Sequence, residues 1–177
     1  MSALAEAWER RRQLHDDPDT ACYRLFDGRF EGAPGWTVDR YGDSAFVQSF
    51  LREGDGRLDG LVSELDSRGL TVVFQDRGAR ADAVVLSGSL PKPELEPIRD
   101  GRFAVRERGI RFGVDLLWGA NTGLFLDARP LRGWVRAHAA GRRILNLFSY
   151  TSAFGVAAML GGATGVTNVD VVPSALE

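Results

Sequence analysis

The sequence predicts an α/β protein in which an N-terminal α+β region is followed by the start of a β-α-β unit. Along the first half of the 177 residues, runs of β-branched and aromatic residues alternate with amphipathic stretches. A proline-rich segment at 91–97 then interrupts the pattern. In the last third, two apolar runs flank one helical stretch, which is typical of a right-handed parallel crossover.

The first half is predicted to contain two helices, over residues 4–14 and 58–69, because apolar residues recur there at helical spacing. The predicted strands cover residues 22–26, 36–40, 44–50, 70–74 and 83–86. A short glycine-containing link at 41–43 indicates a hairpin between the second and third of these strands. The glycine-rich residues 27–35 are predicted to form a loop.

The second half is predicted to begin with another hairpin, whose strands, 103–106 and 110–114, bracket Glu107, Arg108 and Gly109. An amphipathic helix is predicted next, with Leu131, Trp134, Val135 and His138 on the face expected to be buried, Pro130 in its first turn and Gly141 as its C-terminal cap. The crossover consists of a strand at 144–148, a helix at 154–160 and a strand at 166–170, and we predict that these strands pair in parallel. We place the N-terminal α+β domain at residues 1–95 and the hairpin with the start of the second domain at 96–177.

Composition indicates a soluble globular protein, since 44% of the residues are hydrophobic and 26% are charged. No apolar run reaches the roughly 20 residues that cross a bilayer, and the N-terminus lacks the pattern of a signal peptide, so we expect a cytoplasmic protein. A single cysteine, Cys22, excludes an internal disulfide and a cysteine-based zinc cluster. His15 and His138 do not suggest a metal site. The net charge of −2 does not by itself indicate a nucleic-acid partner.

Ligands of an open parallel sheet bind at the carboxyl ends of the strands, where helix N-termini present unpaired amides. Two segments, 146–154 and 170–174, occupy such positions. Asp170 ends the second strand, and its carboxylate can accept hydrogen bonds from two ribose hydroxyls. The same aspartate could instead cap the next helix, so this pattern leaves both roles open. The loop lacks the glycine spacing of a dinucleotide fingerprint, which argues against a nicotinamide or flavin enzyme.

A combination of stretches is more specific than any one of them. Residues 121–129 read Asn-Thr-Gly-Leu-Phe-Leu-Asp-Ala-Arg, residues 145–151 read Leu-Asn-Leu-Phe-Ser-Tyr-Thr, and residues 168–170 read Asn-Val-Asp. In this order they resemble the class I methyltransferase family that includes bacterial large-subunit rRNA methyltransferases. Upstream, residues 32–43 (Gly-Ala-Pro-Gly-Trp-Thr-Val-Asp-Arg-Tyr-Gly-Asp) look like the signature of the domain that precedes catalysis in these enzymes.

This resemblance implies a Rossmann-like catalytic domain, S-adenosyl-L-methionine as cofactor, and RNA, with ribosomal RNA expected, as the methyl acceptor. Ser149, Tyr150 and Thr151 would form the loop beside the methionine moiety, and Asp170 would hold the ribose. The implied cofactor-binding residues are Thr122, Asp127, Arg129, Asn146, Phe148, Ser149, Tyr150, Thr151, Asp170 and Val171.

Asp127 and Arg129 would lie near the amino and carboxylate ends of the cofactor, where opposite charges suit one another. Without the motif, they would be interpreted as a helix-start aspartate and a surface ion pair. The chain departs from the family pattern at Ser152 and Ala153, where Gly-Gly is frequent, and this affects how closely the backbone can approach the cofactor. Asn121 stands where a lysine or glutamine is common.

A class I methyltransferase needs about seven strands, whereas two are predicted after Gly141, so we expect an incomplete catalytic domain. Such a domain would either self-associate through its open edge or have a loosely ordered last third. No catalytic residue is assigned. Cys22 is interpreted as a small buried residue, because the cysteine nucleophile of cytosine carbon-5 methyltransferases comes from a later region. Two alternatives stay open: a non-catalytic RNA-binding or assembly module with a vestigial cofactor fold, and a nucleotide-dependent oxidoreductase. In the first of these, the N-terminal half would contact RNA or a second copy.

Overall fold

The structure, a computed structural model, describes residues 1–93, 95, 100–118 and 121–172. The chain divides into two compact units, Met1–Thr122 and Gly123–Glu177. The predicted domain boundary between residues 95 and 96 stays a prediction, because residues 96–99 lie outside the described part. Pro173 and Ser174, which end the second predicted ligand segment, also lie outside it. Among the described residues, no helix is both long and apolar enough to span a membrane.

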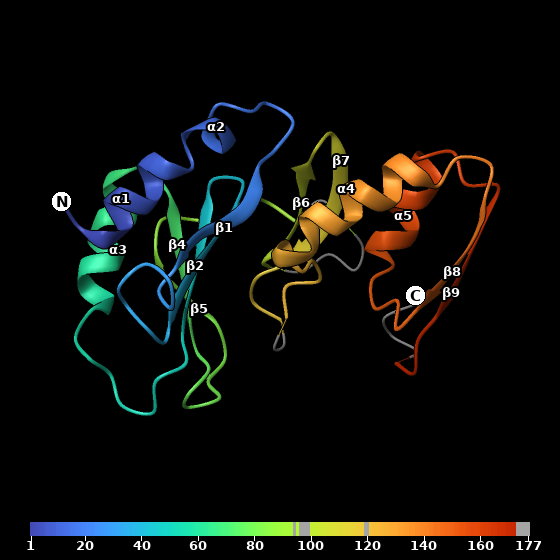
Figure 1. The fold of residues 1–177 in the computed structure, drawn as a ribbon. Coiled ribbons are helices and arrows are strands. Elements are labelled where there is room, and N and C mark those ends of the chain that lie inside the picture. Colours follow the sequence, from blue (N-terminus) through green and yellow to red (C-terminus); the bar gives the residue numbers. More distant parts are fainter. Residues whose placement is uncertain (94, 96–99, 119–120, 173–177) are drawn as a thin grey trace. The chain divides into compact units, whose positions relative to one another are not determined.

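A sheet with the strand order β1-β2-β3-β4-β5 organises the first unit (Figure 1). Its strands are β1 (Cys22–Asp27), β2 (Trp36–Tyr41), β3 (Ser44–Ser49), β4 (Thr71–Asp76) and β5 (Val84–Ser87). Helix α3 (Leu58–Ser67) connects β3 to β4, and these two strands are parallel, whereas the other neighbours are antiparallel. The predicted α+β character of the N-terminal region is therefore confirmed.

Helices α1 (Ala3–Arg10) and α3 cover one face of this sheet (Figure 1). Between the helices and the strands lies a core of fully buried apolar side chains, to which α1 contributes Leu4 and Ala7 and α3 contributes Leu65. The hydroxyl of Ser2 caps α1 by accepting a hydrogen bond from the amide of Ala5, at 2.9 Å. Burial of this apolar face, more than helical propensity, holds the two helices in place.

The single helix predicted over residues 4–14 is interrupted at Arg11, after which α2 (Arg12–His15) follows. The backbone of Arg11 is not helical, with φ −103° and ψ 14°. Its guanidinium donates to the carbonyl of Arg24 at 2.7 Å and to the carboxylate of Glu31 at 2.8 Å. Contacts outside the helix therefore accompany the break, and local spacing could not have predicted them.

Strands β6 (Arg102–Glu107) and β7 (Ile110–Asp115) form the predicted second hairpin within the first unit. At its turn, Arg108 and Gly109 have φ values of 51° and 77°, as a two-residue hairpin turn with the right twist requires. The amide of Ala21 donates to the carbonyl of Arg106 at 2.8 Å, which links this hairpin to the start of β1. Cys22 is fully buried beside it, so its interpretation as a small buried residue is confirmed.

The second unit contains β8 (Arg143–Leu147), α5 (Ala153–Leu160) and β9 (Gly165–Val169). The two strands pair in parallel, from Arg143 opposite Gly165 to Leu147 opposite Val169. The predicted strand-helix-strand arrangement with parallel pairing is therefore confirmed. A 3-10 turn, η1 (Leu126–Ala128), leads into α4 (Arg129–His138), which packs against α5 (Figure 1).

Helix α4 forms where predicted, but the apolar face predicted for it is not the buried one. Leu131 and Trp134 are exposed, whereas Arg132 is only 2% exposed and Ala139 is buried. Val135 belongs to both faces and packs against the buried cluster of Ala139, Ala158 and Ala163. The helix is rotated from the predicted orientation because its contact with α5 lies along the Arg132, Val135 and Ala139 stripe.

Candidate functional site

The loop 148–152 leaves the carboxyl end of β8 directly beside the end of β9. Ser149 extends the ladder, since its amide donates to the carbonyl of Val169 at 3.1 Å. Phe148, Tyr150 and Ser152 have φ values of 55°, 46° and 61°. This left-handed conformation costs a residue with a side chain about 1–2 kcal/mol. Such strain persists where surrounding contacts enforce it, and it clusters at functional sites.

The hydroxyl of Ser149 is buried in this loop and has no hydrogen-bond partner among the described residues. A buried polar group left unsatisfied costs about 1–3 kcal/mol. Nearly all such groups in folded proteins are satisfied by protein, water or ligand. The position therefore fits a ligand that carries a hydrogen-bonding group.

Asp170 directly follows β9, and backbone amides hold its carboxylate. One oxygen accepts from the amide of Tyr150 at 2.7 Å, and the other accepts from the amide of Val172 at 2.9 Å. These hydrogen bonds, the one from Tyr150 first, lower the pKa of Asp170. A carboxylate has about four acceptor positions, more than these amides occupy. An ionised and oriented carboxylate at this place can still accept hydrogen bonds from a ligand hydroxyl.

The segment 123–128 lies against the same loop. The hydroxyl of Thr151 donates to the carbonyl of Gly123 at 2.6 Å. The rings of Tyr150 and Phe125 are 5.4 Å apart between centroids and tilted by 45°. Burial raises the pKa of the Tyr150 phenol above its ordinary value. Two stretches that are far apart in the sequence thus form one continuous surface.

The structure brings together four of the predicted residues, namely Ser149, Tyr150, Thr151 and Asp170. Phe148 and Val171 adjoin these residues in the chain and have exposed side chains. Asp127 is exposed in η1 and Arg129 begins α4, and their cofactor roles stay predictions. Asn146 lies near the end of β8, and its carboxamide donates to Asn168 of β9 at 2.9 Å.

Thr122 is the exception among the predicted residues, because it belongs to the first unit. Its hydroxyl shares a buried hydrogen bond of 2.7 Å with the hydroxyl of Tyr41, and its carbonyl accepts from the amide of Asp115 at 2.9 Å. The contacts of Thr122 therefore support a role in packing, and its cofactor role stays a prediction.

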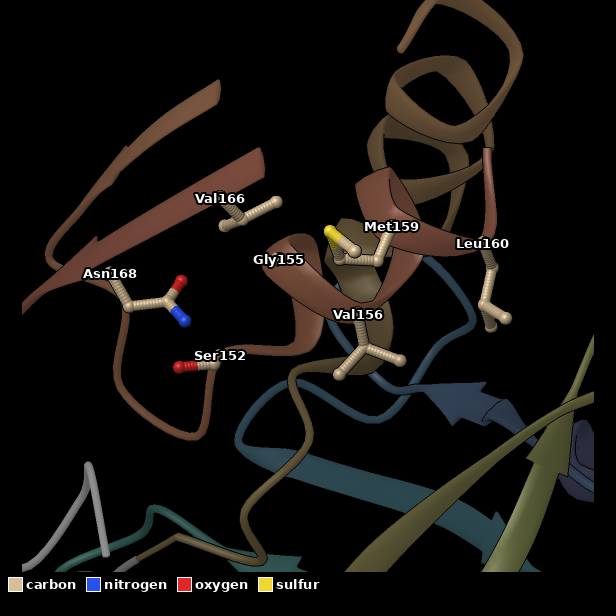
Figure 2. Close-up of a pocket in the computed structure, with 7 residues that line it drawn as sticks. All are labelled: Ser152, Gly155, Val156, Met159, Leu160, Val166 and Asn168. Atoms are coloured by element: carbon tan, nitrogen blue, oxygen red, sulfur yellow. The ribbon is translucent and has the colours of Figure 1, made fainter. Parts of the chain in front are cut away.

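A cavity of about 400 Å³ lies between α5 and β9 (Figure 2). It is lined by Ser152, Gly155, Val156, Met159, Leu160, Val166 and Asn168. The side chains of Ser152 and Asn168 lie at one end, and the remaining wall is apolar (Figure 2). A Cβ atom added to Gly155 would lie 2.7 Å from the carboxamide oxygen of Asn168, so that this side chain packs directly on the helix backbone. The Ser152 end of the cavity borders the loop 148–152.

Comparison with known proteins identifies the family of this chain. Residues 55–177 match the family model described as S-adenosylmethionine-dependent methyltransferase. The chain belongs to this family. The predicted fold class, with an α+β region before a Rossmann-like β-α-β portion, agrees with the solved methyltransferases that it resembles.

Three methyltransferase relatives illustrate the extent of the similarity. YwbD of Bacillus subtilis (strain 168), provisionally assigned as a ribosomal RNA large subunit methyltransferase, is 37% identical over 99% of this chain and 45% of its own length. Ribosomal RNA large subunit methyltransferase I of Shigella boydii is 32% identical over 98% of this chain and 44% of its own. The crystal structure of SMU.776, a provisionally assigned methyltransferase complexed with S-adenosylhomocysteine, aligns over 98% of this chain and 44% of its own, with 30% identity and a TM-score of 0.82. The chain spans about 45% of the length of the curated relatives it matches.

Three residues in or beside this candidate site were not predicted from the sequence: Gly123, Phe125 and Arg132. Gly123 and Phe125 lie inside the motif at 121–129, so their place in the motif was an available signal. Arg132 follows the motif, and arginine on a helix is ordinarily solvated. Its burial carried no local signal.

Proposed function

We propose that this protein transfers a methyl group from S-adenosyl-L-methionine to RNA, with ribosomal RNA as the substrate. One observation carries the proposal. The loop 148–152 holds three left-handed residues and an unpartnered buried hydroxyl, and it lies against the oriented carboxylate of Asp170 at the carboxyl ends of two parallel strands. Membership of the family supports the choice of cofactor.

The residues present fit this cofactor. Asp170 would accept the ribose hydroxyls, and Ser149 would bond to the methionine portion through its buried hydroxyl. Asp127 and Arg129 would provide opposite charges for the amino and carboxylate groups. The bound cofactor supplies a methyl group on a positively charged sulfonium. The protein therefore has to position its reactants, and it needs no acid or base at the sulfur.

The choice of RNA as the methyl acceptor rests on the relatives, which are named as ribosomal RNA methyltransferases. An enzyme that acts on ribosomal RNA would work in the cytoplasm. A feature of the first unit agrees with RNA contact. Phe30, on the glycine-rich loop, is 78% exposed, and the guanidinium of Arg29 lies 5.6 Å from the centroid of its ring. Exposed aromatic and arginine planes are the groups on which unpaired RNA bases stack.

Replacing Asp170 with alanine tests the cofactor site. We expect the affinity for S-adenosylhomocysteine, measured by calorimetry, to fall roughly ten- to a hundredfold, because hydrogen bonds to a charged group are lost. Asp43→Ala, at an exposed aspartate of the β2–β3 turn, is the matched control and should bind as tightly as the unchanged protein. Equal affinity of the Asp170 variant would remove the ribose role. RNA binding with no cofactor binding at all would favour the non-catalytic module.

A further inference from the structure

A buried arginine lies on α4 beside the proposed cofactor site. Arg132 is 2% exposed. Removal of a cation from water costs several kcal/mol unless the cation is paired or hydrogen-bonded. A buried arginine at this position therefore needs partners that compensate for the lost water, and these partners indicate what the residue does.

Arg132 contacts two segments that border the loop 148–152, namely the segment 123–128 and the first turn of α5. One terminal nitrogen donates to the carbonyl of Phe125 at 2.8 Å, and the guanidinium lies 5.9 Å from the centroid of the Phe154 ring. Phe125 belongs to the segment 123–128, and its ring contacts Tyr150 in the loop. Phe154 lies in the first turn of α5, where the loop ends.

We propose that Arg132 is a positioning residue that holds the segment 123–128 on the loop 148–152 and so keeps the loop in its cofactor-binding conformation. This inference rests on the proposed function of the loop. Left-handed residues relax unless their surroundings enforce the strained backbone. The rigid planar guanidinium of an arginine can bond to a carbonyl and cover an aromatic ring at the same time.

The test uses Arg132→Met and Arg132→Lys, with Arg136→Met as a control on the exposed side of the same helix. Hydrogen exchange is followed at the amide of Tyr150, which donates to Asp170, and at the amides of β8 and β9. In Arg132→Met, we expect the Tyr150 amide to exchange at least tenfold faster and the affinity for S-adenosylhomocysteine to fall at least tenfold. Arg132→Lys should restore part of both. The strand amides should not change, and neither should any amide in Arg136→Met.

Unchanged exchange at Tyr150 in Arg132→Met would overturn the proposal. Equally accelerated exchange in β8 and β9 would also overturn it, because Arg132 would then support the whole unit and not the loop. If Arg132→Met does not fold, Arg132→Lys decides, since loss of local protection in that variant supports the proposal and full protection contradicts it. If the unchanged protein binds no S-adenosylhomocysteine, the proposed function fails, while the exchange comparison still decides the role of Arg132.

Discussion

The two compact units differ in what they bury. The main core of the first unit contains large side chains, with Phe26, Leu25 and Leu65 almost completely inaccessible. In the second unit, the main buried cluster between helices and strands consists of small residues, Ala139, Ala158 and Ala163, with Val135, Ile144 and Val166 packed against it. Apolar residues of the second unit with more than half of their surface exposed include Leu131, Trp134, Leu145, Leu147, Met159 and Leu160.

This difference matters for the site. Complete burial of a leucine or phenylalanine contributes about 1.5–3 kcal/mol, whereas an alanine methyl contributes far less. The described part of the second unit therefore depends more on its backbone ladder and on polar contacts such as those of Asp170 and Arg132. Binding loops are commonly found in the less stable part of a protein. The strained loop 148–152 lies in the unit with the smaller core, where cofactor binding would stabilise the fold most visibly.

The largest effect on stability is expected when one leucine in each unit is replaced with alanine. Leu25→Ala in β1 should lower the free energy of unfolding of the first unit by about 2–5 kcal/mol, because Leu25 is fully buried. Leu145→Ala in β8 should change stability by no more than about 0.5 kcal/mol, because Leu145 is 63% exposed. Urea denaturation measures both. A large loss of stability in Leu145→Ala would mean that the β8 face that carries Leu145 is covered in solution. If light scattering then gave a molecular mass twice that of the chain, a second copy would be what covers it.

The next effect concerns the close approach of α4 and α5. A Cβ atom at Gly161 would lie 2.1 Å from the carbonyl oxygen of Arg136, so Gly161→Ala should destabilise the second unit by about 1–3 kcal/mol. Gly165→Ala is the matched control, because a Cβ atom there meets open space. Hydrogen exchange of the α4 and α5 amides measures the difference. Equal protection of these amides from exchange in both variants would show that α4 and α5 can move apart without a loss of stability.

A smaller effect of opposite sign is expected at Ser152, which has φ 61°. Ser152→Gly should raise the stability of the second unit by about 0.5–1 kcal/mol, because glycine adopts this conformation without steric cost. Ser63→Gly, at an exposed position of α3, should instead lower stability by about 0.5–1 kcal/mol. Thermal unfolding of the two variants compares them. A destabilised Ser152→Gly would mean that the serine side chain contributes a contact that outweighs the backbone strain.

The smallest effect is a pH dependence confined to the first unit. His15 stacks on Trp8, with ring centroids 4.1 Å apart, and burial, assisted by the nearby charge of Arg40, lowers its pKa below the ordinary value of 6.5. The unfolded chain then binds more protons than the folded one, so stability is full above about pH 6.5 and falls as the pH decreases through the folded pKa. Denaturation between pH 7 and 5 should show this decrease, and His15→Gln should reduce it. The same slope in both proteins would assign the dependence to other groups.

Local sequence patterns were sufficient to predict several elements of this protein. The alternation of apolar runs predicted β8, α5 and β9 and their parallel pairing, because a crossover helix between two short strands admits few other arrangements. The hairpin turn at Arg108 and Gly109 was predicted from the two β-rich runs that flank it. The motif residues Ser149, Tyr150 and Asp170 come together at the strand ends because the ladder register places them there.

Tertiary structure alone decided which polar side chains are buried and with what partners. Arg11 interrupts the first helix while bonded to Glu31, Arg132 is buried although arginine usually faces solvent, and the hydroxyl of Thr122 bonds to Tyr41, 81 residues away in the sequence. Periodicity and motifs describe neighbours a few residues apart. The partner of a polar group depends instead on which distant segment supplies a carbonyl, hydroxyl or carboxylate at hydrogen-bond distance, and only the folded chain determines that.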